Sequence, residues 1–153
     1  MVSVKPLKIC LTCSAGGHLT ELLQLSPAWA GMKVFYVTDR RAKITGIHER
    51  EKVYFVRVPR RNPIHLTQNI VQSFRIFLME KPDVLISTGA DVSIPLLLIG
   101  KLFGKKIVFI ESFCRIDEPS LSAKIMYGFS DLFYVQWPKM KKFFPKAREG
   151  SVF

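Results

Sequence analysis

The chain has 153 residues, of which 48% are hydrophobic and 23% charged, and these values fit one folded domain and exclude a wholly disordered chain. Lysine and arginine number 23 against 12 acidic residues, which gives a formal net charge of +11. A surface this basic attracts polyanions such as nucleic acid, anionic lipid or phosphorylated substrates, and charge by itself does not choose among them.

Cysteine usage and the apolar runs argue against a disulfide scaffold and against a membrane-spanning helix. The three cysteines, Cys10, Cys13 and Cys114, are odd in number and lie in apolar settings, which indicates reduced thiols. Cys10 and Cys13 lie three residues apart on an expected strand, so they face opposite sides and favour packing over a redox pair. The longest apolar run, residues 94–100, is far shorter than the ~20 residues that cross a bilayer, and residues 1–8 show no signal-peptide pattern. We therefore expect any membrane contact to be peripheral.

Strand-like and helix-like segments alternate along the whole chain. The expected strands are residues 7–13, 33–38, 52–58, 84–87, 106–111 and 131–136. The expected helices are residues 18–25, 66–80, 91–103 and 119–129, with a short Lys-rich helix or tail after them. This alternation predicts an α/β fold: one Rossmann-like, doubly wound parallel sheet over residues 1–153, covered by helices on both faces.

Sheets of this kind bind ligands outside the carboxyl ends of their strands. A polar turn lies at this end of the first expected strand, residues 7–13. Gly16 and Gly17 permit a sharp turn and a close approach to a ligand. His18 begins the next helix, where free N–H groups favour an anion and a neutral imidazole can act as a general base. The alternative is that the glycines only make the turn and that His18 only caps the helix.

Two further turns follow the fourth and fifth strands. Asp91, two residues after Gly89, offers a carboxylate that can also serve as the N-cap of the next helix. Glu111 ends an apolar strand, where a carboxylate is costly unless it is used or paired, and Arg115 is its nearest candidate partner. The three turns supply the candidate catalytic residues His18 and Glu111 and the candidate substrate-binding residues Ser14, Gly16, Gly17, Thr88, Gly89, Asp91, Ser112 and Arg115.

The second strand is followed by Asp39, Arg40 and Arg41, which could bind a ribose and a phosphate. The G-x-G-x-x-G fingerprint that would accompany such a use is absent. We interpret this segment as a solvated turn.

Basic and aromatic residues also gather at two surfaces. Arg60, Arg61 and His65 precede the amphipathic helix 66–80 and are candidates to contact a membrane or a pyrophosphate. The apolar helix 94–103 suits either the membrane interface or the core. Residues 139–153 follow Trp137 and mix lysines with Phe143, Phe144 and Phe153; exposed aromatics among basic residues predict a contact with a partner protein.

Four segments carry a family resemblance. They read S-A-G-G-H-L-T-E-L, S-T-G-A-D-V-S-I-P, F-I-E-S-F-C-R-I-D-E-P-S-L-S and D-L-F-Y-V-Q-W-P, in this order. Together they resemble the PssD and CpsF group of bacterial exopolysaccharide proteins, over about residues 8–138. That group is similar to subunit fourteen of the asparagine-linked glycosylation pathway and to the N-terminal half of GT-B glycosyltransferases such as MurG.

The resemblance implies a two-component glycosyltransferase. The donor half, which holds the UDP-sugar, would be a separate protein, and this chain would be the non-donor subunit, inactive without that partner. The pair would transfer a hexosyl or N-acetylhexosaminyl group to a lipid-pyrophosphate-linked acceptor at the cytoplasmic face of the membrane. His18 matches a histidine that is a candidate base or oxyanion partner, and Glu111 matches a glutamate of the acceptor cleft.

Two other functions compete with this one. The charge favours nucleic-acid binding, but no helix-turn-helix, RRM or OB signature is present, so we expect no nucleic-acid partner. A standalone nucleotide-binding enzyme would need the G-x-G-x-x-G fingerprint, which is absent from this sequence. We expect neither a metal nor a cofactor on this chain, because GT-B enzymes need no metal held by a D-x-D motif and the sequence has no such motif.

Overall fold

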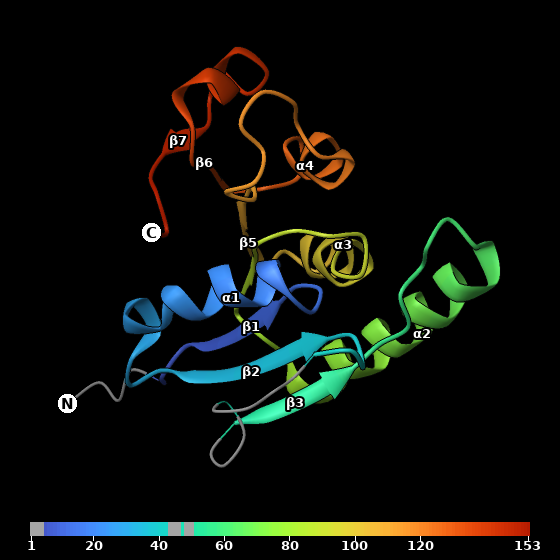
Figure 1. Ribbon diagram of the computed structural model, residues 1–153. Helices are drawn as coiled ribbons and strands as arrows, with labels where there is room; N and C mark the ends of the chain where they lie inside the picture. The colour runs from blue at the N-terminus through green and yellow to red at the C-terminus, as the bar shows by residue number, and fades with distance from the viewer. Residues whose placement is uncertain (1–4, 43–46, 48–50) are drawn as a thin grey trace.

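A computed structural model describes residues 5–42, 47 and 51–153 of the chain (Figure 1). Its centre is a seven-stranded sheet in the order β3-β2-β1-β4-β5-β6-β7, in which every pair is parallel. The strands are β1 (Lys8–Thr12), β2 (Lys33–Thr38), β3 (Lys52–Phe55), β4 (Val84–Ser87), β5 (Lys106–Ile110), β6 (Leu132–Val135) and β7 (Arg148–Glu149). The order reverses between β1 and β4, so ligands are expected beyond the carboxyl ends of these two strands.

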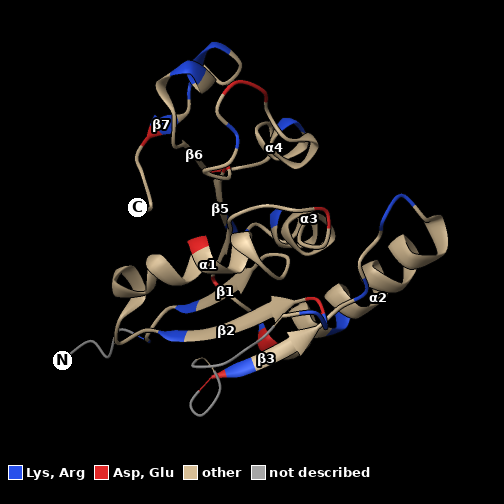
Figure 2. Cartoon of the chain, in the orientation of Figure 1, with Lys and Arg blue, Asp and Glu red and all other residues tan. Residues whose placement is uncertain are grey.

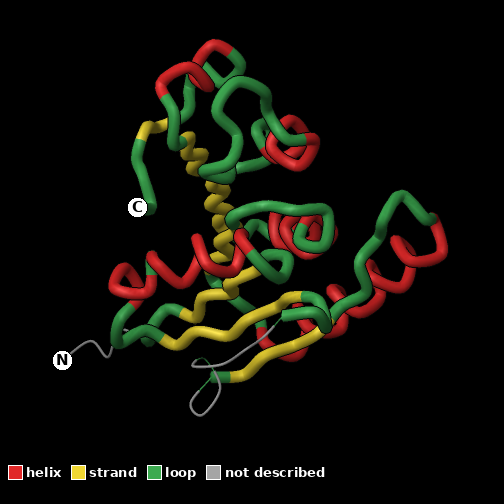
Figure 3. The backbone as a smooth tube through the Cα atoms, in the orientation of Figure 1, coloured by secondary structure: helices red, strands yellow, loops and turns green. Residues whose placement is uncertain are grey.

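Helices cover both faces of the sheet and connect its strands (Figure 3). The helices are α1 (Gly17–Gln24), α2 (Pro63–Glu80), α3 (Ile94–Leu102) and α4 (Leu121–Met126), with 3-10 turns η1 (Ser26–Trp29) and η2 (Pro138–Lys142). One core cluster joins α2, α3 and α4 to one face of the sheet, and a second joins α1 and η1 to the other. The expected fold class, a doubly wound parallel α/β sheet, is confirmed.

The pleat of β1 distributes its side chains between the two cores. Cys10 belongs to the cluster under α2 and α3, while Leu11 and Cys13 belong to the cluster under α1. Both cysteines are buried and free. The expectation that Cys10 and Cys13 face opposite sides and pack rather than pair is confirmed.

The helix α2 begins earlier than its apolar pattern predicts. The Asn62 side chain accepts hydrogen bonds from the backbone N–H of Ile64 at 2.9 Å and of His65 at 3.2 Å, and Pro63 occupies the first helical position. An asparagine N-cap and a proline at the first position both favour a helix start, and here they come before the apolar pattern that begins at Leu66. As a result, His65 lies in the first turn of α2 rather than in a loop.

Two interpretations of apolar segments need correction or refinement. Phe144 is buried with Met140 and Ala147 in the main core, so the expectation of an exposed Phe144 is wrong. Met140 lies in η2, and Phe144 and Ala147 follow η2 on the way to β7, so this segment packs on the sheet rather than forming a solvated tail. The helix α3 buries Leu96, Leu97 and Ile99 against the core, so only its end is exposed; within the described residues no helix is long and apolar enough to span a membrane.

Candidate functional site

The turn after β1 is joined to the turn after β4 by two hydrogen bonds. His18 Nδ1 lies 2.8 Å from the Thr88 carbonyl oxygen, and the Thr88 hydroxyl donates to the His18 carbonyl oxygen at 2.6 Å. A carbonyl oxygen can only accept, so Nδ1 carries the proton of this bond. In the neutral ring the lone pair then belongs to Nε2, which is the tautomer that a general base requires.

Gly89 is needed for His18 to lie where it does. Its φ is +112°, a backbone conformation that side-chain-bearing residues rarely adopt. A Cβ at this position would lie 3.2 Å from Cε1 and 3.4 Å from Nδ1 of His18. The turn after β4 therefore orients the His18 imidazole in two ways. The Thr88 carbonyl oxygen accepts a hydrogen bond from Nδ1, and the Gly89 backbone lies close to the ring.

The structure gives Asp91 a different partner from the one expected. Ser93, not Asp91, directly precedes α3, and the Asp91 carboxylate accepts a hydrogen bond from the Arg60 N–H at 3.1 Å. The expectation of an Asp91 N-cap is wrong, because the chain makes one more turn before the helix begins. Asp91 instead ties the turn after β4 to the loop that precedes α2.

Glu111 is fully enclosed and is bonded within its own loop. Only 1% of its surface is exposed, and its carboxylate accepts from Ser112 N at 3.0 Å and from Ser120 N and Oγ at 2.9 and 3.0 Å. Within the described part of the chain, no ion pair joins Glu111 to Arg115, so the expected pairing is wrong. Arg115 is exposed, and among the residues that the structure describes Glu111 makes no hydrogen bond to His18.

A buried carboxylate that the sequence analysis did not single out links α1 to the loop after β5. Glu21, 3% exposed, accepts from Ser112 Oγ at 2.8 Å, from Phe113 N at 3.2 Å and from Gln136 Nε2 at 3.2 Å. Glu21 lies three residues after His18, and residues at this spacing share one face of a helix. That spacing is the signal that could have identified it.

The segment after β2 is a turn in which Arg40 and Arg41 are exposed, as expected, but Asp39 is buried. Asp39 is 1% exposed and accepts from Ala15 N at 3.0 Å, from Arg41 N at 3.0 Å and from Arg41 Nε at 2.7 Å. Burial raises the pKa of this carboxyl, but the hydrogen bonds from Arg41 and Ala15 outweigh it, so the net pKa lies below the ordinary value. Asp39 therefore fixes the turn that leads to His18 and holds Arg41 beside it.

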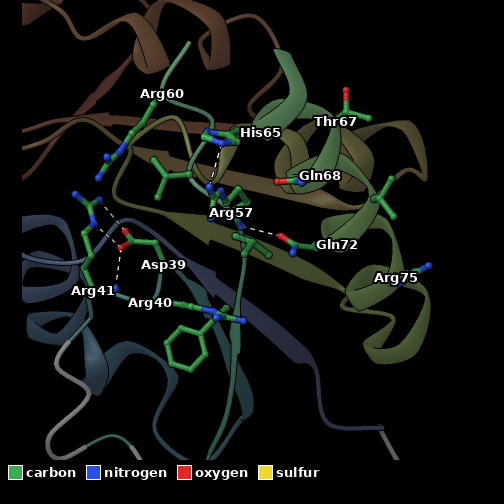
Figure 4. Close-up of a pocket in the computed structure, with 14 residues that line it drawn as sticks. Asp39, Arg40, Arg41, Arg57, Arg60, His65, Thr67, Gln68, Gln72 and Arg75 are labelled. Carbon is green, nitrogen blue, oxygen red and sulfur yellow. Dashed lines mark hydrogen bonds and ion pairs between the residues drawn. The ribbon is translucent and has the colours of Figure 1, made fainter. Parts of the chain in front are cut away.

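Beside Asp39 lies a cavity of about 670 Å³, which we call the arginine pocket (Figure 4). It lies at the carboxyl ends of β2 and β3 and is walled by α2. The basic residues that line it are Arg40, Arg41, Arg57, Arg60, Arg75 and His65. Arg60 and His65, two of the residues expected to contact a membrane or a pyrophosphate, line this pocket, and the third, Arg61, does not. Arg57 Nη2 lies 3.0 Å from His65 Nε2.

Comparisons with known proteins agree with this architecture. A family described as oligosaccharide biosynthesis protein Alg14 like matches residues 9–152. The mouse UDP-N-acetylglucosamine transferase subunit ALG14 is 30% identical over 92% of this chain and 80% of its own length, and the Saccharomyces cerevisiae subunit is 27% identical over 95% and 76%.

Among solved structures, Acinetobacter baumannii MurG superposes with a TM-score of 0.71 at 15% identity, over 87% of this chain and 42% of MurG. The Rickettsia bellii UDP-N-acetylglucosamine 2-epimerase superposes with a TM-score of 0.76 at 14% identity, over 97% of this chain and 46% of the epimerase. The chain thus spans less than half the length of either solved protein, and at these identities the likeness concerns the fold. The family match over nearly the whole sequence is decisive: this chain belongs to the Alg14-like family of oligosaccharide biosynthesis proteins.

Proposed function

We propose that this chain is the acceptor- and membrane-binding subunit of a two-component UDP-sugar glycosyltransferase, which transfers a sugar to a lipid-pyrophosphate-linked glycan. Membership of a family whose curated members are named transferase subunits supports the reaction class. The observation that carries the assignment of a site is the orientation of His18 by Thr88 and Gly89 beyond the carboxyl ends of β1 and β4. That edge is where open α/β sheets place their ligands.

His18 would act as the general base toward the acceptor. As the acceptor hydroxyl oxygen bonds to the anomeric carbon of the donor sugar, the bond from that carbon to UDP breaks and Nε2 of His18 takes the hydroxyl proton. The exposed Gly16 and Gly17 let the acceptor approach the N-terminus of α1, whose free N–H groups favour negative charge. The candidate binding residues Ser14, Ser112 and Arg115 lie on the turns around α1, and Glu111 would position the loop of Ser112 and Arg115 rather than react.

The donor would be supplied by a partner protein that binds the UDP-sugar. An apolar groove of about 300 Å³ supports a contact near the C-terminus, because Ile86, Val108 and Tyr134 of the sheet are only half-buried there beside Ser151 and Val152. Parallel sheets are normally covered on both faces. Residues 139–153 therefore remain our candidate for the partner contact, with Phe143 and Phe153 exposed and Phe144 excluded.

Contact with the cytoplasmic face of the membrane would be peripheral and would use α2. Its outer face exposes large apolar side chains, and Figure 2 shows basic residues on the loop that leads into it. Exposed apolar groups bordered by cations are typical of helices that lie in a membrane interface. The apolar residues concerned are Ile64, Leu66, Ile70, Phe74, Leu78 and Met79.

The test is a transfer assay with the purified chain, alone and with a donor-binding partner. Sugar transfer from a UDP-sugar to a lipid-pyrophosphate acceptor should require both proteins, and His18→Ala should lower kcat by roughly 10²–10⁴-fold, the usual contribution of a positioned base. Gln24→Ala, at an exposed position of the same helix, is the matched control. Transfer by the lone chain would refute the two-component assignment, and normal transfer by His18→Ala would leave His18 only a structural role.

A further inference from the structure

The arginine pocket is not used by the transfer chemistry proposed for His18. Five guanidinium groups line it, and Asp39 is the one carboxylate among the described lining residues. That carboxylate is already engaged by Arg41 and by the Ala15 N–H. Within residues 5–42, 47 and 51–153, no other pocket arginine has an ion pair within 4.0 Å. The pocket therefore carries a surplus of positive charge that an anionic ligand would neutralise.

Several contacts hold this arrangement in place. Arg57 Nη2 donates to His65 Nε2 at 3.0 Å, because a guanidinium can only donate. Arg57 N donates to Gln72 Oε1 at 2.7 Å. Arg60 has a φ of +45°, a conformation that non-glycine residues adopt only where their surroundings enforce it, here with the Arg60 N–H bonded to Asp91. Arg57, like Arg41 beside Asp39, is thus held in place before a ligand binds, which lowers the entropic cost of ordering these two side chains.

The chemistry of the pocket suits an oxyanion such as phosphate. Guanidinium groups match the oxygen spacing of phosphate with paired N–H donors. The described lining residues include five arginines and no lysine. Gln68, Gln72 and Thr67 add neutral hydrogen-bonding groups on the α2 side. Figure 4 shows the labelled side chains of Arg41 and Arg60 reaching toward the same part of the pocket from two different loops.

An apolar surface begins where the pocket ends. Val71 lines the pocket and is exposed, and the exposed side chains of Ile70 and Phe74 flank it on α2. Phe74 lies 6.2 Å, ring centroid to ring centroid, from Phe103 at the end of α3, which extends the apolar surface to a second helix. A ligand that filled both regions would carry phosphate next to hydrocarbon.

From this juxtaposition we propose that the arginine pocket binds the phosphate group of a membrane lipid, with the hydrocarbon directed along the exposed face of α2. The phosphate can belong to the pyrophosphate of the lipid-linked acceptor or to the headgroup of an anionic phospholipid. The inference deepens the proposed function, on which it rests for the membrane setting. It does not require His18 to be a base.

The experiment measures sedimentation of the lone full-length chain with vesicles of phosphatidylcholine, of phosphatidylcholine with phosphatidylglycerol, and of phosphatidylcholine with polyprenyl pyrophosphate at matched surface charge. The pocket variant is Arg40→Gln with Arg75→Gln. Both side chains are exposed and make no hydrogen bond to other described residues, so folding should be preserved and is checked by thermal melting. The control is Lys33→Gln with Lys124→Gln, which removes the same charge outside the pocket.

The pocket variant should bind anionic vesicles roughly thirtyfold more weakly, which corresponds to about 1 kcal/mol per cation, and the control should bind within a few-fold of the wild type. Preference for polyprenyl pyrophosphate, with competition by inorganic pyrophosphate, identifies the acceptor as the ligand, whereas equal binding to phosphatidylglycerol identifies a headgroup. The proposal is overturned if both variants weaken vesicle binding equally, or if the pocket variant does not weaken it. Because neither partner nor donor is present, this outcome is independent of the His18→Ala transfer assay.

Discussion

Replacing Gly89 with alanine perturbs His18 without removing any of its atoms. The added Cβ would lie 3.2 Å from Cε1 and 3.4 Å from Nδ1 of His18, closer than the usual separation of about 3.5–4.0 Å between nonbonded carbon atoms. The ring must therefore shift by several tenths of an ångström, and the 2.8 Å hydrogen bond to Thr88 would lengthen with it. Misplacement on this scale can cost one to two powers of ten in rate, so Gly89→Ala should lower transfer by roughly 10–100-fold.

Gly104→Ala is the matched control. Gly104 also has a positive φ, +71°, but a Cβ there would meet no atom within 4 Å. Both variants carry backbone strain of roughly 1–3 kcal/mol, seen as a lower Tm, and only Gly89→Ala should lose transfer and shift the His18 ring resonances in NMR spectra. Loss of transfer by both variants, or by neither, would refute the reasoning that Gly89 positions His18.

Two further predictions concern stability and thiol chemistry. Burial of Glu80 raises the pKa of its carboxyl, but hydrogen bonds from Lys8, Tyr54 and Lys52 outweigh burial and lower the pKa from 4.5 to about 2. This folded-state pKa lies below the unfolded value, so the carboxylate contributes up to about 3 kcal/mol above pH 4.5, and the contribution is lost as the pH falls toward 2. Glu80→Gln should therefore lower the urea midpoint at pH 7 and flatten its decline in acid; an unchanged midpoint at pH 7 would contradict this. Burial raises the pKa of Cys10 well above its ordinary value and that of Cys13 to about 12, whereas Cys114 is exposed. A soluble thiol reagent should thus modify Cys114 alone in the native chain, as counted by intact mass, and modification of two or more thiols before unfolding would disagree.

The local sequence was sufficient to predict most of the fold. Apolar runs bounded by glycine and proline located the strands because a parallel sheet buries both of its faces and so requires continuous apolar segments. The first turns of α2 were missed because its start is set by Asn62 and Pro63, which act through capping rather than periodicity. The burial of Phe144 was also missed, because the exposed basic residues that surround it in the sequence resemble a solvated tail.

In the candidate site, too, the local features could be predicted from the sequence and the long-range contacts could not. The Gly-Gly-His turn is visible in the sequence because glycine and a helix start are local features. The partners of its carboxylates are not, since Glu21 and Ser112 are 91 residues apart in the chain and Asp39 and Ala15 are 24 apart. Such pairings depend on the lateral order of the strands, which adjacent residues do not encode.

The sequence by itself determined an α/β chain with a basic surface, reduced cysteines and an imidazole at a helix start, because composition, periodicity and turn chemistry are properties of neighbouring residues. Only the tertiary structure decided which carboxylates bond to which loops, and that five arginines from separate segments face one cavity. The physical reason is that the sheet order brings the ends of distant strands to one edge, where unsatisfied polar groups must pair with whatever lies within reach.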